Sequence, residues 1–246
     1  MERPGPPDVA RVVTVHGGLD RASSFLRTER HLPDLTVVRY DRRGYARSLD
    51  AGPAVDFDQQ VDDLVGVVDG RPSVVVGHSF GGLLALALAG RRPDLVRAVL
   101  VYEAPMPWLG WWPLATPGQA ATRFAETPAE AAERFMRALI GDEHWARLPA
   151  PTRQQRRAEG PALLADLASV RPPAPVPIDP ATIVAPLVVA SGGRSPGHQR
   201  RAAEEIAGAA PRGERHEIAG AGHGAHLSHP AELAALVRRA VALAGS

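Results

Sequence analysis

The chain alternates between short runs of β-branched residues and longer segments whose apolar positions recur every three or four residues. The first pattern predicts buried strands, and the second predicts helices that pack through one face. The helical spacing is clearest in residues 56–68, where Phe57, Val61, Leu64 and Val68 fall on one face. In chain order, we predict strands at 9–15, 35–40, 74–76, 95–102, 186–190 and 215–218, and helices at 20–31, 56–68, 83–89, 198–209 and 231–243.

Strands separated by helices predict an α/β fold with a mostly parallel sheet and helices on both faces. Residues 104–180 interrupt this rhythm with prolines, aromatic residues and helical segments near 128–139 and 153–168. We therefore expect a core formed by 1–103 and 181–246, with 104–180 inserted as a helical lid. The alternative is that the aromatic residues only anchor the insertion onto the core. They are Trp108, Trp111, Trp112, Phe124, Phe135 and Trp145.

Composition excludes several classes of function. The 28 basic and 27 acidic residues nearly cancel, which argues against nucleic acid or an anionic membrane as partner. The absence of cysteine and lysine excludes disulfides, thiolate metal sites and Schiff-base chemistry. No apolar segment resembles a secretory signal or is long enough to span a bilayer. We expect a soluble cytoplasmic protein that acts on a small molecule, with its oligomeric state left open.

The most informative motif lies between the strand at 74–76 and the helix at 83–89. Gly77-His78-Ser79-Phe80-Gly81 has the Gly-x-Ser-x-Gly spacing of a nucleophile elbow, a sharp strand-to-helix turn that exposes the serine hydroxyl. The helix N-terminus beside Ser79 offers N–H groups that stabilise a developing oxyanion. The alternative, an ordinary glycine turn, does not account for the flanking β-branched strand and long apolar helix.

Four segments together resemble the α/β-hydrolase superfamily over nearly the whole chain. They are His16-Gly17-Gly18, residues 40–48 (Tyr-Asp-Arg-Arg-Gly-Tyr-Ala-Arg-Ser), the elbow around Ser79, and residues 221–227 (Ala-Gly-His-Gly-Ala-His-Leu). The resemblance implies the α/β-hydrolase fold. Members commonly begin with an antiparallel hairpin before the His-Gly strand, but only about eight residues precede that strand here. We therefore predict a sheet reduced to about six parallel strands.

The order of catalytic groups in this superfamily is serine, acid, histidine, which implies His223 as the base for Ser79. A neutral imidazole accepts the serine proton and later returns it to the leaving group. Two alternatives for His223 are a metal ligand together with His226 and His229, or a loop histidine without a role. A spacing of three along a loop does not favour a metal, so we expect none.

The acid is the unusual element. The superfamily usually carries it after the strand here at 186–190, but residues 191–196 contain no carboxylate, and Ser195 stands at about that place. A second known position follows the strand after the elbow helix, where this chain has Glu103. We predict Glu103 as the triad acid; alternatively it is a hinge residue of the lid, and the triad is incomplete.

The resemblance further implies an oxyanion hole formed by the N–H groups of Phe80 and Gly18. Trp108, Trp111 and Trp112 are expected to bind an apolar or aromatic substrate. The expected function is hydrolysis of ester or thioester bonds through an acyl-enzyme. Alternatives are carbon–carbon bond hydrolysis, lactone opening, a non-hydrolytic biosynthetic step on the same residues, or ligand binding without turnover. We expect no cofactor, because no phosphate-binding glycine loop follows His16.

Overall fold

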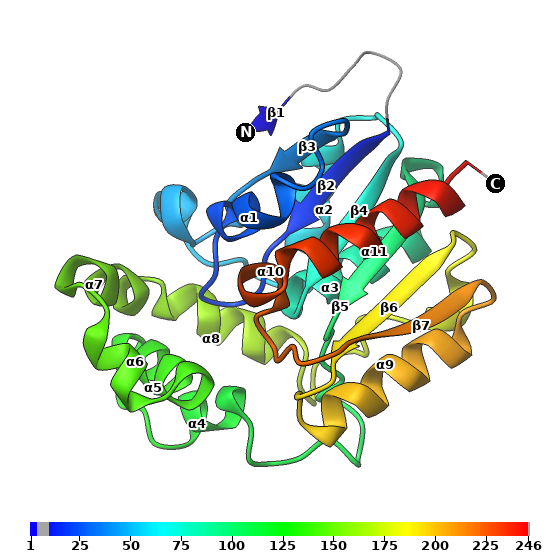
Figure 1. Ribbon diagram of the computed structural model, residues 1–246. Helices are drawn as coiled ribbons and strands as arrows, with labels where there is room; N and C mark the ends of the chain where they lie inside the picture. The colour runs from blue at the N-terminus through cyan, green and yellow to red at the C-terminus, as the bar shows by residue number, and fades with distance from the viewer. Residues whose placement is uncertain (4–9, 246) are drawn as a thin grey trace. The chain divides into compact units, whose positions relative to one another are not determined.

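The computed structural model describes residues 1–3 and 10–245; Val9, at the start of the first expected strand, lies outside them. The described strands form one sheet in the order β1-β3-β2-β4-β5-β6-β7 (Figure 1). Strands β2 to β7 pair in parallel, which confirms the predicted six-stranded parallel sheet. The strands are β1 (Glu2–Arg3), β2 (Arg11–Val15), β3 (Thr36–Arg39), β4 (Ser73–His78), β5 (Val96–Tyr102), β6 (Leu187–Gly192) and β7 (Gly213–Ile218).

One strand was not predicted. Strand β1 pairs antiparallel with β3, with Glu2 opposite Val38 and the next residue opposite Val37. The terminal ammonium group of Met1 also donates to the carbonyl of Arg39 at 2.8 Å. Strand β1 therefore adds a short antiparallel edge to the sheet. This strand is too short for a hydrophobic pattern in the sequence to predict it.

Helices cover both faces of the sheet. Helices α1 (Leu26–Glu29) and α11 (Pro230–Leu243) pack on one face, where α11 crosses in front of the strands in Figure 1. Helices α3 (Phe80–Arg91) and α9 (Gly197–Ala209) pack against the other face. Helix α3 is buried on nearly every side, as expected for a helix that is apolar all round. The remaining helices near the sheet are α2 (Phe57–Val68) and α10 (Ala225–Ser228).

Residues Asp41–Gln60 and Pro107–Val176 form a second compact unit. Its helices are α4 (Pro117–Arg123), α5 (Pro128–Ile140), α6 (Asp142–Arg147), α7 (Ala150–Ala158) and α8 (Gly160–Ser169). The single helix expected at 153–168 is thus two helices. The helix is interrupted at Glu159, between α7 and α8. Gly160 begins α8 at a point where a Cβ atom would lie 1.9 Å from the carbonyl oxygen of Pro128, and Pro161 follows immediately. That the insertion works as a lid stays a prediction.

A buried ion pair explains why residues 41–60 belong to this second unit. Arg42 Nη2 lies 2.7 Å from Asp166 Oδ2, and Tyr45 donates its hydroxyl hydrogen to the same oxygen at 2.7 Å. Gln60 Nε2 donates to Asp166 Oδ1 at 2.7 Å. These partners compensate the burial of two charges, which is costly when either charge is left alone.

None of the helices in the described part of the chain is long and apolar enough to span a membrane.

Candidate active site

The turn after β4 has the backbone of a nucleophile elbow. Ser79 is the N-cap of α3 and has φ 53° and ψ −125°, a conformation that a residue with a side chain rarely adopts. A Cβ atom on Gly77 would lie 2.4 Å from the carbonyl oxygen of Gly81, and one on Gly81 would lie 2.3 Å from that of Val15. Both glycines are therefore required for the start of α3 to pack this closely on β2 and β4.

Glu103 follows the last residue of β5 and is 1% exposed. Its backbone is also strained, with φ 52°, and its N–H donates to the carbonyl of Ala190 on β6 at 3.0 Å. Its Oε1 accepts hydrogen bonds from the N–H of Gly192 at 2.9 Å and from the hydroxyl of Ser195. Its Oε2 lies 2.6 Å from Nδ1 of His223. A buried carboxylate needs such partners to compensate lost hydration.

These contacts determine the ionisation of Glu103. Burial alone would raise the pKa of its carboxyl, but the hydrogen bond and charge of His223, together with the bonds from Ser195 and Gly192, hold the pKa below its ordinary value. The side chain is therefore an anion at neutral pH. An anionic acceptor at Nδ1 of His223 favours the tautomer in which Nδ1 carries the hydrogen and Nε2 presents a lone pair.

The loop that carries His223 is tied to the sheet by two side chains. The hydroxyl of Tyr102 donates to the carbonyl of Gly222 at 2.7 Å, and Nε2 of His78 lies 2.9 Å from the carbonyl oxygen of His223. The rings of His78 and His223 are 4.7 Å apart between centroids. His78 directly precedes Ser79 in the chain, so the residue that contacts His223 is adjacent to the strained serine. No hydrogen bond joins Ser79 Oγ to His223 among the described residues.

Comparison with known proteins agrees with this architecture. A family model described as "Alpha/beta hydrolase family" matches residues 12–236. The chain belongs to the α/β hydrolase family. It is 39% identical to lipase LipV of Mycobacterium tuberculosis over 106 residues, which cover 42% of this chain and 40% of the lipase. It is 34% identical to the uncharacterized hydrolase YraK of Bacillus subtilis over 98 residues, which cover 37% and 36% of the two chains. The matched segments thus span well under half of either relative.

Two solved structures share the fold over almost the whole chain. A thermophilic esterase from Thermogutta terrifontis has a TM-score of 0.75 at 19% identity and covers 100% of this chain and 93% of its own. The enol-lactonase of Burkholderia xenovorans has a TM-score of 0.75 at 20% identity and covers 98% and 96%. At this level of identity, the likeness establishes the α/β-hydrolase fold and leaves the reaction to the site itself.

One expected oxyanion donor of this α/β hydrolase lies at the elbow, and the other follows a residue that packs on the elbow. Phe80 is the first residue of α3. Gly17 packs so closely on the elbow that a Cβ atom there would lie 3.0 Å from Cβ of Ser79, and Gly18 is the next residue. His16 is fully buried, and its Nδ1 lies 2.8 Å from the carbonyl oxygen of Gly17. The role of Phe80 and Gly18 as oxyanion donors stays a prediction.

The three tryptophans expected to bind substrate belong to the second unit. Trp108, Trp111 and Trp112 are partly buried, and the rings of the last two are 5.8 Å apart. Trp145, by contrast, is fully buried, and its indole N–H donates to Glu133 at 3.1 Å. Trp145 therefore packs within its own unit, whereas anchoring onto the core and a substrate contact for the other three both stay predictions.

Sequence reasoning missed several supporting residues. It noted Ser195 only as the residue that stands where the acid usually lies, whereas the hydroxyl of Ser195 donates to the carboxylate of Glu103. It did not single out Tyr102, which holds the loop before His223. It also overlooked the cluster of Asp20, His78 and His226 described below. The sequence signals for this cluster were a histidine directly before the elbow serine and a second histidine three positions after His223.

Proposed function

We propose that this chain is a serine hydrolase that cleaves ester or thioester bonds through an acyl-enzyme. Ser79 is the nucleophile, His223 the general base and Glu103 the acid that orients it. The observation that carries the proposal is the 2.6 Å contact between Glu103 Oε2 and Nδ1 of His223, in the same unit as a serine with positive φ. Together these features match the roles of a serine, histidine and carboxylate triad.

The reaction follows from these roles. The hydroxyl of Ser79 attacks the carbonyl carbon of the substrate while Nε2 of His223 accepts its proton, and the buried Glu103 carboxylate stabilises the resulting imidazolium. The N–H groups of Phe80 and Gly18 stabilise the oxyanion. The alcohol or thiol leaves with the proton from His223. Water, deprotonated by the same nitrogen, then releases the acid and regenerates Ser79.

The substrate is a small apolar or aromatic acyl compound, as the tryptophans at 108–112 suggest. One relative is named a lipase and one structural neighbour an esterase, and both names denote hydrolysis of ester bonds, which supports including esters. A lactone is an internal ester, so the same residues would open one by the same steps. Lactones therefore belong in the substrate panel.

The proposal is tested by labelling with a fluorophosphonate, which reacts with activated serines, and by kcat/KM on a panel of esters, thioesters and lactones. We expect one label per chain, and the loss of both labelling and turnover in Ser79→Ala. Ser228→Ala is the matched control, because Ser228 is an exposed serine of α10. Absence of labelling in the parent protein would contradict the proposal and favour ligand binding without turnover.

A further inference from the structure

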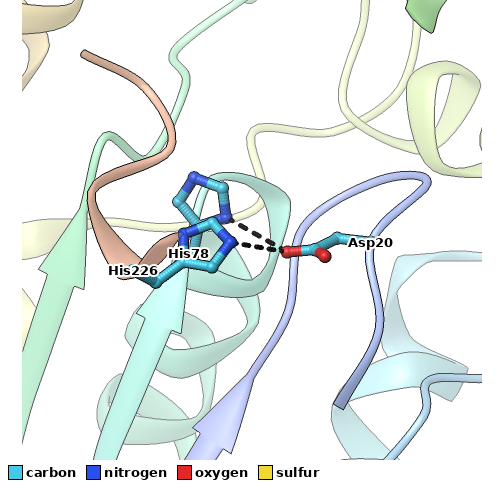
Figure 2. A group of neighbouring side chains, drawn as sticks. All are labelled: Asp20, His78 and His226. Atoms are coloured by element: carbon cyan, nitrogen blue, oxygen red, sulfur yellow. Dashed lines mark ion pairs between the residues drawn. The ribbon is translucent and has the colours of Figure 1, made fainter. Parts of the chain in front are cut away.

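Three side chains behind the elbow converge on one point. Figure 2 shows ring nitrogens of His78 and His226 directed at the same carboxylate oxygen of Asp20. His78 ends β4, His226 lies in α10, and Asp20 lies in the loop after β2. His78 is 6% exposed and His226 is 2% exposed. Each of the three residues offers one ligand atom, and these atoms all lie within 4.8 Å of one another.

The hydrogen bond of His78 determines which of its nitrogens carries the hydrogen. Its Nε2 lies 2.9 Å from the carbonyl oxygen of His223, and a carbonyl oxygen can only accept. Nε2 therefore donates, and in the neutral ring Nδ1 presents a lone pair. That lone pair faces Oδ2 of Asp20 at 3.8 Å, and Nδ1 is buried without a hydrogen-bond partner. Two electron-rich atoms thus face each other in a buried site.

The ring of His226 approaches the same carboxylate oxygen of Asp20. Its Nε2 lies 3.2 Å from Oδ2 of Asp20, an ion-pair distance without the geometry of a hydrogen bond, and its Nδ1 has no hydrogen-bond partner among the described residues. One face of the ring stacks on Phe25 with centroids 5.2 Å apart, so the ring orientation is held by packing. Buried polar atoms almost always have a partner. Two of these nitrogens, Nδ1 of His78 and Nε2 of His226, face one oxygen of Asp20 without a hydrogen bond, which indicates that a cationic partner belongs there.

We propose that Asp20, His78 and His226 bind one divalent transition-metal ion, with Zn²⁺ as the representative case. Two imidazoles and one carboxylate are a ligand set that suits Zn²⁺ and its first-row neighbours better than Mg²⁺ or Ca²⁺. A tetrahedral ion with bonds of about 2.1 Å separates its ligand atoms by about 3.4 Å. The contacts of 3.2 and 3.8 Å to Asp20 lie on either side of this value. Water completes the coordination.

The sequence analysis expected no metal, because it considered the histidines only as a run in one loop with His223. The fold instead selects His226 from that loop and combines it with His78 and Asp20 from two other segments. The ion joins the loop after β2, the end of β4 and α10. Since His78 holds the carbonyl of His223, the ion stiffens the support of the base without touching the substrate. The metal site therefore stands or fails separately from the proposed hydrolysis.

The test uses the full chain, purified without a histidine tag and dialysed against a chelator. Binding of ZnCl₂ is followed by calorimetry, and the retained metal is counted by mass spectrometry. We expect one Zn²⁺ per chain and a rise in Tm with added Zn²⁺, because an ion that binds only the folded state stabilises it. Co²⁺ in place of Zn²⁺ should give the intense visible absorption of a tetrahedral site.

Asp20→Asn and His226→Phe each remove one ligand, and the second keeps a ring to stack on Phe25. We expect each variant to bind Zn²⁺ more weakly by more than about tenfold, since even outer partners of ligands cost that much. His31→Gln is the matched control, because His31 is exposed and outside the cluster. Circular dichroism reports whether each variant folds. Zn²⁺ binding by one folded variant is sufficient to test the proposal. Zn²⁺ binding that is equal in parent and variants, or no binding by the parent, would overturn the proposal.

Discussion

Ser195 donates its hydroxyl hydrogen to Oε1 of Glu103, across 92 residues of chain. The position expected to carry the acid of the triad thus supports the carboxylate proposed for that role, which follows another strand. The N–H of Gly192 donates to the same oxygen at 2.9 Å and leaves Oε2 for His223. The two carboxylate oxygens therefore have separate roles, one for anchoring and one for the base.

Replacing Glu103 by glutamine should lower kcat/KM by about 10⁴-fold, the order seen when the acid of a triad loses its charge. The amide has no charge with which to stabilise the imidazolium. Asp179→Asn is the control, because Asp179 is exposed and only caps a short turn through the N–H of Ala181. Steady-state kinetics on the best substrate of the panel measures both. If Glu103→Gln keeps most of the parent activity, Glu103 is not the acid.

Ser195→Ala should lower kcat by about 10- to 100-fold, because a hydrogen bond to a charged group contributes about 1.5–3 kcal/mol. KM should change little, since Ser195 orients Glu103 and does not bind substrate. Ser195→Thr retains the hydroxyl and should restore most of kcat. A threonine variant as slow as the alanine variant would show that the space around Ser195, and not its hydrogen bond, is what matters.

Gly77→Ala should prevent stable folding. The new Cβ atom would lie 2.4 Å from the carbonyl oxygen of Gly81 and 2.5 Å from Cα of Gly82, both backbone atoms that cannot move aside. Gly66→Ala is the control, because Gly66 lies inside α2 with open space around its Cβ position. There alanine should stabilise the helix by up to about 1 kcal/mol. Urea unfolding compares the two, and equal stabilities would refute the close packing of the elbow.

The pH dependence of stability should report the ionisation of Glu103. Its folded-state pKa is lower than the ordinary value of 4.5, so the carboxylate stabilises the folded state fully above about pH 4.5. This contribution is lost as the pH falls through the folded-state pKa. The free energy of unfolding of the parent should therefore exceed that of Glu103→Gln at pH 7, and the difference should shrink in acid.

Urea titrations of both proteins between pH 7 and the acid limit of reversible unfolding provide this comparison. Glu143→Gln serves as control, because Glu143 is exposed and pairs only with Arg147 at 2.9 Å. If the difference in the free energy of unfolding between the parent and Glu103→Gln stays constant into acid, the three partners do not stabilise the ionised form of the Glu103 carboxyl.

Local pattern was sufficient for the parallel strands and for the elbow, because each is encoded within about a dozen neighbouring residues. The position of Glu103 at the end of β5 could be predicted because the end of a strand is a local feature. Its partner Ser195 could not, since their contact depends on the register that sets Tyr102 beside Ala190. The break before Gly160 was missed although Gly160-Pro161 is a local signal for it, whereas the close contact of Gly160 with Pro128 of another helix could not be read from the sequence.

Ser79 and Glu103 both leave the sheet through a residue of positive φ, one strand apart, and each donates its N–H to the neighbouring strand. Their spacing is thus a property of the β-ladder, and the contacts described for Glu103 and His223 also come from the sheet unit. The groups proposed to react and the insertion at 107–176 therefore lie in separable stretches of the gene. Exchanging 107–176 together with 41–60, which supplies Arg42 for the buried pair with Asp166, for the equivalent segments of another family member would test whether this unit sets the choice of substrate.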